Sequence, residues 1–232
     1  MSAAQVLQNV LKKYSPAQLQ KLAPYIPQEE REELGELIED SLCTEDPLYW
    51  VQNWTLTENP KYIAQGLPFK SPFPRKSYFV PLFARLMASK RLLIPKSREM
   101  ITSWSVMAYV TNRAQFKRAF AVVQTEAEGK VIDLLRYCRI LYENQPDWLK
   151  QRHPLSSDPS QTEMRWKDGG RVLGIPKGEH KIRLYHPTIY VMDEAAFLPE
   201  AQQCYDAAHP VAEQIIGISS AGPGWFGDQC SR

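Results

Sequence analysis

Runs of consecutive apolar residues mark the strands that this chain predicts. They lie at 91–95, 120–125, 189–192 and 214–220, and a hairpin with a Gly-containing turn spans 162–175. A run that is apolar at nearly every position is typical of a strand buried on both faces, as in a parallel sheet. Helical patterns, with apolar residues three and four positions apart, lie between most of these runs. The chain therefore predicts an α/β fold, with a mainly parallel sheet flanked by helices.

The first 44 residues differ from the rest. Helical patterns over 3–13, from Ser15 onward and over 29–42 are separated by breaks. We predict that residues 1–44 form a small N-terminal helical extension, which covers a sheet edge or serves as a docking element. The remainder, 45–232, is then one domain.

Residues 43–80 are rich in proline and aromatic residues. Proline at this density precludes long regular elements, yet the segment is too apolar for a loose linker. We expect it to pack against the sheet domain, with most of its aromatic side chains in the core, although an adenine could also lie between two of them. An amphipathic helix over 77–90 follows, with Phe79, Phe83 and Met87 on its apolar face.

Length and composition narrow the class of protein to which this chain can belong. The chain has 232 residues, enough for one large α/β domain and a small appendage, and its formal charge of +2 is nearly balanced. Its four cysteines are scattered and its four histidines form no ligand motif, so we expect free thiols in a reducing cytoplasm and no zinc site. No apolar run approaches the length of a membrane span, which indicates a soluble intracellular protein.

Two adjacent carboxylates, Asp193 and Glu194, directly follow the apolar run at 189–192. The carboxyl end of such a strand faces the crevice in which open α/β sheets bind ligands. In an ATPase, Asp193 would hold the Mg²⁺ of Mg-ATP and Glu194 would orient or deprotonate the attacking water. The alternative is a buried strand that ends in two solvated acids.

A basic turn follows the apolar run at 91–95 and precedes a helical pattern that continues to about residue 113. Strand, loop and helix in this order are the context that a phosphate-binding loop needs, because the helix N-terminus offers unpaired N–H groups. Lys96 at the head of the turn can reach the β- and γ-phosphates, and Ser103 at its end can bind Mg²⁺. The alternative is a basic cap on an ordinary strand-to-helix turn.

The turn departs from the common Gly-x₄-Gly-Lys-Ser/Thr pattern. It contains no glycine, and Thr102 stands where the usual lysine would be. Ile101 is the awkward residue, because a β-branched side chain resists positive φ.

A third motif, Ser219-Ser220-Ala221, ends the run at 214–220. The ordered set of strand–basic loop–helix, strand–Asp-Glu and strand–Ser-Ser resembles the ATPase domain of the large terminase subunit of tailed bacteriophages, the motor that packages DNA into the capsid. The resemblance covers roughly residues 45–230 and implies a P-loop NTPase sheet of the ASCE type.

The resemblance also implies roles for residues of this sequence. Glu194 and Arg98 would be catalytic, Ser103 and Asp193 would hold Mg²⁺, and Ser219 and Ser220 would couple the γ-phosphate state to DNA movement. ATP would be bound by the whole turn: Lys96, Ser97, Arg98, Glu99, Met100, Ile101, Thr102 and Ser103.

Partners follow from the same resemblance. It implies a homo-oligomeric ring around double-stranded DNA in the host cytoplasm, working with a portal protein and a small terminase subunit and with no membrane. A basic loop at 177–183 could face DNA phosphates or be a solvated connection. An arginine of a neighbouring subunit would complete the site, and the candidates are Arg139, Arg152, Arg165, Arg171 and Arg183.

Two departures from the family bear on function. Ile101 replaces the usual loop glycine, and the chain ends at Arg232, before the nuclease domain that family members carry. We therefore expect a fragment or a truncated product without nuclease activity. The alternatives are a helicase-like ATPase, or a catalytically silent module of the ATPase fold that binds DNA or the portal.

Overall fold

The computed structural model describes Ser15, Gln18, Lys21 and residues 28–97, 100–222 and 224–231. The helix predicted over 3–13 lies outside these residues, as does most of the one predicted from Ser15. The main sheet has six strands in the order β3-β8-β7-β4-β6-β5, all parallel except the edge strand β5. Its strands are β3 (Arg91–Pro95), β4 (Phe120–Thr125), β5 (Glu163–Arg165), β6 (Arg171–Pro176), β7 (Ile189–Asp193) and β8 (Gln214–Ser219).

The predicted α/β fold is confirmed, and the apolar runs lie where parallel strands belong. Every residue of β7 is buried, and so are all residues of β4 and β8 after the first. Strands buried on both faces need apolar side chains at odd and even positions alike, which is why the sequence shows runs rather than alternation. The predicted hairpin is the antiparallel pair of β5 and β6.

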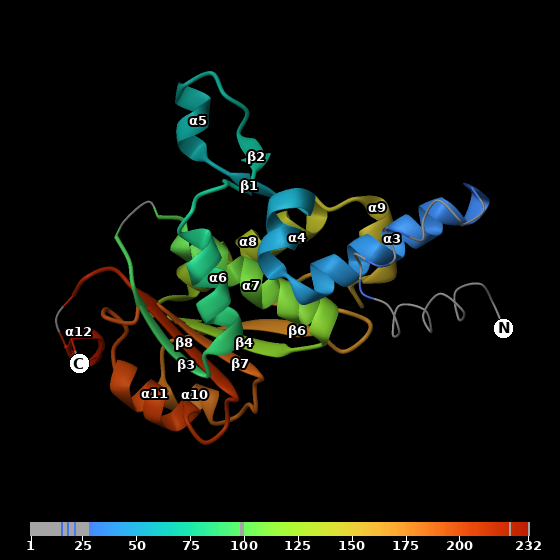
Figure 1. The fold of residues 1–232 in the computed structure, drawn as a ribbon. Coiled ribbons are helices and arrows are strands. Elements are labelled where there is room, and N and C mark those ends of the chain that lie inside the picture. Colours follow the sequence, from blue (N-terminus) through green and yellow to red (C-terminus); the bar gives the residue numbers. More distant parts are fainter. Residues whose placement is uncertain are drawn as a thin grey trace.

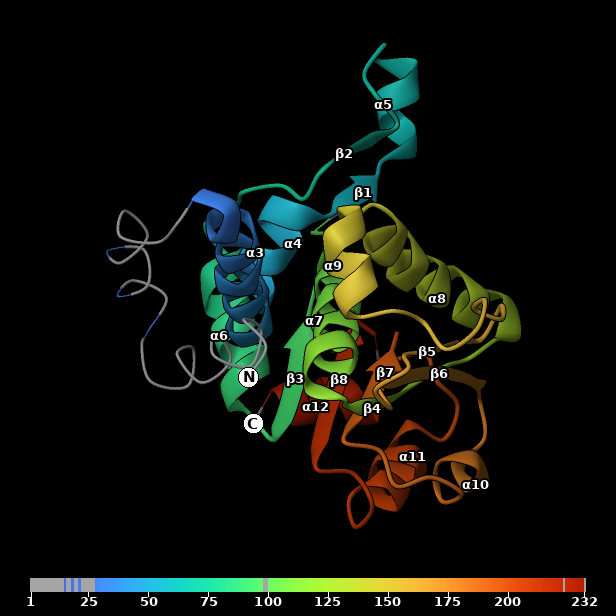
Figure 2. The same ribbon diagram turned by 90° about the vertical axis from the view of Figure 1, so that its right-hand side faces the viewer.

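Helices cover both faces of the sheet (Figures 1 and 2). One face carries α6, α7 and α8, with α3, α4 and α9 outside them, and the other carries α10, α11 and α12. Of the helices that the structure describes, none is both long enough and apolar enough to cross a membrane. Their bounds are α3 (Gln28–Glu45), α4 (Pro47–Trp54), α5 (Pro60–Ala64), α6 (Phe79–Ala88), α7 (Thr102–Lys117), α8 (Glu128–Glu143), α9 (Asp147–Arg152), α10 (Glu179–Ile182), α11 (Ala201–Ala208) and α12 (Trp225–Cys230).

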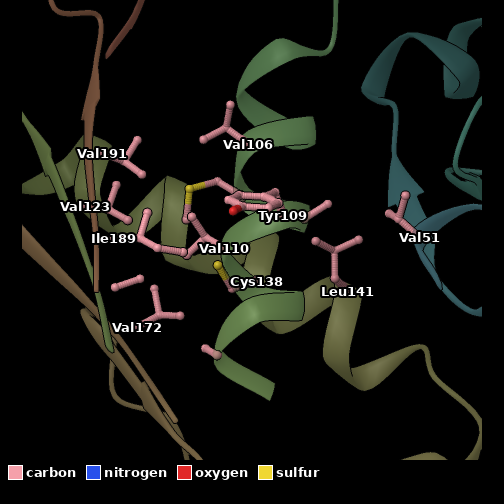
Figure 3. Close-up of a cluster of buried hydrophobic side chains, with 14 of the residues drawn as sticks. Val51, Val106, Tyr109, Val110, Val123, Cys138, Leu141, Val172, Ile189 and Val191 are labelled. Carbon is pink, nitrogen blue, oxygen red and sulfur yellow. The ribbon is translucent and has the colours of Figure 1, made fainter. Parts of the chain in front are cut away.

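The larger core lies between the sheet and α7. Val106 and Val110 of α7 face Val123 of β4 and Val191 of β7, and all four side chains are fully buried (Figure 3). Burial of this apolar area stabilises the fold by about 25 cal/mol per Å². It also fixes the position of α7, whose N-terminus begins the candidate site.

Gly170, in the turn before β6, shows how closely this layer is packed. A Cβ at Gly170 would lie 1.9 Å from the carbonyl oxygen of Ala114 in α7. No side chain fits at that distance, so the turn needs glycine for close approach.

The N-terminal helix α3 packs mainly on other helices. Its principal contacts are with α4, α7 and α9, and the amide of Asn112 in α7 donates to the carbonyl of Cys43 at 2.8 Å. Over the part of the predicted extension that the structure describes, α3 therefore covers helices rather than a sheet edge. Its apolar face, with Leu34, Leu37 and Ile38, is buried against α7 and its neighbours rather than against a strand.

The proline-rich segment forms only short elements, as predicted. Asp46 caps α4 by accepting from the amides of Leu48 and Tyr49, and Trp50 is fully buried. After α4, the strands β1 (Leu56–Glu58) and β2 (Lys70–Pro72) pair with each other and carry α5 away from the body of the molecule (Figures 1 and 2). Within α6, Phe79 and Phe83 are buried as predicted, whereas Met87 is 50% exposed, so its assignment to the apolar face was wrong.

Candidate functional site

Three loops meet at the carboxyl edge of the sheet. They follow β3, β7 and β8, which are neighbours in the order β3-β8-β7. Because the three strands are parallel, their carboxyl ends lie at one edge. The basic turn, the carboxylate pair and the Ser-Ser motif are thereby brought together from positions that span more than half of the chain.

The turn between β3 and α7 takes an unusual path into the helix. Ile101 precedes α7 with φ 56° and ψ 21°, the left-handed region. A β-branched residue there is strained by roughly 1–2 kcal/mol. Its carbonyl nevertheless accepts the amide of Ser105 at 2.9 Å, which begins the helical ladder. The position that a glycine usually takes is thus left-handed, and the sequence places isoleucine in it.

The other residues of the turn differ in exposure. Ser97 and Met100 are exposed, and Thr102 is buried as the first residue of α7. The Tyr78 hydroxyl donates to the carbonyl of Met100 at 3.2 Å, which ties the turn to α6. The predicted residues Arg98 and Glu99 lie outside the described residues.

A chain of hydrogen bonds joins Glu194, Lys96, Ser103 and Asp193. The Lys96 Nζ is 2.7 Å from Glu194 Oε1 and 3.4 Å from Ser103 Oγ. The Ser103 hydroxyl donates to Asp193 Oδ1 at 3.1 Å. One cation, one hydroxyl and two carboxylates therefore form a continuous polar cluster.

The Ser-Ser motif holds the second carboxylate. Glu194 Oε2 accepts from the Ser220 hydroxyl at 2.9 Å, the Ser220 amide at 3.1 Å and the Ser219 hydroxyl at 3.3 Å. Glu194 itself has φ 51°, so the chain turns sharply at the end of β7. The carboxylate is consequently fixed from both sides, by Lys96 and by the end of β8.

The two carboxyl groups have opposite electrostatic settings. Burial raises the pKa of Asp193, and this outweighs the opposing charge of Lys96. Burial also tends to raise the pKa of Glu194, but the hydrogen bonds from Lys96 and Ser220 outweigh it, so that this pKa lies below its usual range. Glu194 is therefore well suited to remain ionised, while Asp193 is a buried acid that favours a counter-charge.

Two further residues line this site. Lys96, Glu194 and Ser220 share a cleft of about 250 Å³ with Lys130 and Phe197. Lys130 lies in the first turn of α8, after β4, and Phe197 is 48% exposed after the carboxylate pair. Sequence reasoning did not identify Lys130, although its place just beyond a parallel strand at the same sheet edge was a usable signal.

The oxygen atoms of Ser103 and Asp193 suit a hard divalent cation. Magnesium takes one or two protein oxygens and completes its shell with water and phosphate oxygens. Among the described residues, no group of three or more His, Cys, Asp or Glu side chains could hold a metal by itself. The donor set thus fits a metal that arrives with a phosphate ligand rather than a site that the protein closes alone.

The candidate trans-acting arginines lie in different surroundings. Arg139 donates to the carbonyl of Ser160, and Arg183 is exposed, with no partner in the described part of the chain. The remaining three have carboxylate partners: Arg152 with Glu36, and Arg165 and Arg171 with Glu163. The segment predicted as a basic loop contains the short helix α10, whose Ile182 is buried against α11.

Strand order and site geometry together define a mainly parallel α/β domain with loops that converge at the carboxyl edge of its sheet. Among solved structures, the fold is that of a large terminase. The chain is similar to the HK97 bacteriophage large terminase with a TM-score of 0.55 over 77% of this chain, at 7% sequence identity. The matched region is 38% of the HK97 chain, so this chain spans well under half of that protein.

The large terminase ATPase domain of Thermus phage P74-26 is also similar. Its TM-score is 0.48 at 12% identity, and a mutant of that domain gives 0.43 at 14%, each over 72% of both chains. No protein-family model matches the sequence, and no curated protein matches it. The similarity to the HK97 large terminase confirms the predicted resemblance for the fold.

Proposed function

We propose that this chain is the ATPase part of a large terminase, which hydrolyses Mg-ATP to move double-stranded viral DNA into a procapsid. The observation that carries the proposal is the meeting of Lys96, Ser103, Asp193 and Glu194 at one sheet edge. Phosphoryl transfer needs positioning and charge neutralisation more than covalent chemistry, and this cluster supplies both.

Lys96 would neutralise the phosphates. Its ammonium group is already at the head of α7, where the helix N-terminus adds a partial positive charge. In the arrangement described here, Lys96 donates to Glu194. A triphosphate would take over part of that interaction, which leaves Glu194 to its serine partners.

Ser103 and Asp193 would hold Mg²⁺. When bound, the ion would supply neutralisation of the phosphate charge. A divalent cation beside Asp193 favours the ionised carboxylate and so offsets the effect of burial on its pKa. The hydrogen bond from Ser103 already points one Asp193 oxygen toward the head of α7.

Glu194 would position the attacking water and accept its proton. Its lowered pKa keeps it ionised at neutral pH, as a general base requires. Ser219 and Ser220 would couple hydrolysis to movement, because they join this carboxylate to β8. A change at the γ-phosphate that moves Glu194 would therefore also move the loop after β8.

By the family resemblance, the active form would be a homo-oligomeric ring around DNA in the host cytoplasm, with portal and small-subunit partners. A neighbouring subunit's arginine would complete each site. Arg183 is our candidate, because its exposed side chain has no partner within the described residues, whereas the other four donate elsewhere. The absence of nuclease activity remains a prediction.

A specific observation favours a second candidate, a catalytically silent module of the same fold. Ile101 occupies a left-handed position with a side chain that opposes it. Such a turn could bind phosphate too weakly for turnover, while the fold still presents a surface to DNA or the portal.

Hydrolysis of ATP, measured with and without duplex DNA, distinguishes the two candidates. We expect Mg²⁺-dependent turnover that DNA stimulates and that Lys96→Ala abolishes. Binding of DNA without any nucleotide binding or turnover, in the chain alone and in a longer form that includes a nuclease domain, would favour the silent module.

A further inference from the structure

The wall of the site formed by β4 and α8 has no role in the proposed mechanism. It begins at Thr125, the last residue of β4, and continues through Glu126 to Lys130 in the first turn of α8. Lys130 lines the same cleft as Lys96, Glu194 and Ser220. The cleft thus contains two lysines, of which the proposed mechanism uses only Lys96.

Lys130 is held by a bond that is easily exchanged. Its ammonium pairs with Glu126, four positions earlier, and the two side chains are 50% and 35% exposed. Exposed pairs of this kind contribute little stability, because water and salt compete with them. Lys130 can therefore leave Glu126 for a more highly charged anion at small cost.

Lys130 and the carboxylate pair, Asp193 and Glu194, interact electrostatically. The hydrogen bond to Glu126 is the main cause that raises the pKa of Lys130, and the charges of Glu194 and Asp193 add to it. In return, Lys130 lowers the pKa of Asp193. The lysine is thus close enough to the carboxylate pair to respond to what binds there.

A second observation on this wall is a buried polar atom that the protein leaves without a partner. The Thr125 hydroxyl is fully buried and has no hydrogen-bond partner among the described residues. Val123 pairs with Val191 in the register of β4 and β7. Side chains two residues apart share a face, so Thr125 and Asp193 both point toward the α7 and α8 layer. A buried hydroxyl without a partner beside Asp193 indicates a polar group that arrives with the ligand.

We propose that Lys130 is a second phosphate-binding cation, which exchanges Glu126 for the terminal phosphate of a bound nucleoside triphosphate. The inference rests on the proposed ATPase function and deepens it. The exchange would make the site distinguish triphosphate from diphosphate, because only the triphosphate carries the terminal phosphate for which Lys130 would leave Glu126. Glu126 would act as the competitor that holds Lys130 until that group is present.

The test compares the dissociation constants of Mg-ADP and of a non-hydrolysable Mg-ATP analogue by calorimetry. Lys130→Ala is expected to weaken analogue binding by about ten- to a hundredfold, the effect of one charge-assisted hydrogen bond, and ADP binding by much less. Lys130→Arg should keep most of the preference. Glu126→Gln should tighten analogue binding, an effect opposite in sign that a merely structural role would not produce.

Lys150→Ala is the matched control, because Lys150 also forms an exposed ion pair with a nearby acid, Asp147, and does not line this cleft. Equal losses for both nucleotides in Lys130→Ala, or no loss, would overturn the inference while Lys96-dependent binding kept the ATPase proposal. If the unmutated chain binds neither nucleotide, the ATPase proposal fails and the inference fails with it.

Discussion

Lys96 and Glu194 form an ion pair at 2.7 Å across 98 positions of sequence. Their side chains are only 14% and 23% exposed, so the pair is protected from most of the solvent. It joins the turn after β3 to the end of β7 and satisfies both charges when no anion is present. Nucleotide binding at this edge must therefore compete with an existing salt bridge, and hydrolysis depends on how Glu194 is held once Lys96 is shared.

The first prediction concerns Ser220, which donates its hydroxyl and its amide to Glu194. Ser220→Ala keeps the amide but removes the hydroxyl, so the pKa of Glu194 should rise from its lowered value. Because the base must be ionised, the acidic limb of the pH profile of kcat/KM should move to higher pH. Turnover at neutral pH should fall roughly three- to tenfold.

Ser231→Ala provides the control for that profile. Ser231 also donates a hydroxyl within its own neighbourhood, to the carbonyl of Gly227, but it does not contact the carboxylate pair. An unchanged acidic limb in Ser220→Ala would show that this hydroxyl does not tune the base.

The second prediction concerns Asp193 and stability. Its pKa is raised in the folded chain, so its contribution to stability is fully present below about pH 3.9, the usual value for Asp, and is lost as the pH rises through the folded value. At neutral pH the buried charge is destabilising, and Asp193→Asn should raise Tm by about 2–4 °C, as about 1 kcal/mol does in a domain of this size. Mg²⁺-dependent nucleotide binding should be lost at the same time.

The gain in Tm should shrink as the pH falls toward 4, because the wild-type carboxyl then becomes neutral as well. Thermal unfolding between pH 4 and 8 measures it, with exposed Asp158→Asn as the control. A lower Tm for Asp193→Asn at neutral pH would mean that the hydrogen bond and the charge of Lys96 outweigh burial.

The third prediction concerns Ile101 and its left-handed backbone. Both Ile101→Ala and Ile101→Gly remove the side chain from its packing, but only glycine also removes the φ strain. The glycine variant should therefore be the more stable of the two by about 1 kcal/mol in urea unfolding. It should also bind nucleotide more tightly, since the turn becomes free to close on phosphate.

At Gly35 in α3 we expect the reverse order of stability, with alanine more stable than glycine. A Cβ at Gly35 meets nothing within 4 Å, and the residue lies inside a helix. Gly35→Ala should therefore stabilise the chain by roughly 0.5–1 kcal/mol. If alanine is also the better residue at position 101, the left-handed conformation of that turn is wrong.

Much of the sheet could be predicted because its strands are buried on both faces. A run such as Ile189 to Met192 has few other structures open to it, and the carboxylates that follow it necessarily lie at the carboxyl edge. The meeting of Lys96 with Glu194 was also accessible, because parallel strands place their carboxyl ends together.

Other features were beyond the sequence because they depend on packing between distant elements. The spacing of apolar residues in α3 predicts an apolar face but does not indicate whether a strand or a helix covers that face. In the structure, helices α4, α7 and α9 cover it. Lys130 looks like an ordinary surface lysine of an amphipathic helix. Only the adjacency of β4 and β7 brings the start of α8 to the same cleft.

The most direct test of the account compares Mg-ATP binding and single-turnover hydrolysis in Glu194→Gln and Lys96→Ala. Loss of a general base or of water positioning costs about a hundredfold or more in rate, so Glu194→Gln should hydrolyse at least that much more slowly. It should bind Mg-ATP as tightly as the unmutated chain or more tightly, because Lys96 is released, whereas Lys96→Ala should lose binding. Hydrolysis by Glu194→Gln at the unmutated rate, or unchanged binding by Lys96→Ala, would contradict the convergence of these residues on one magnesium-bound triphosphate.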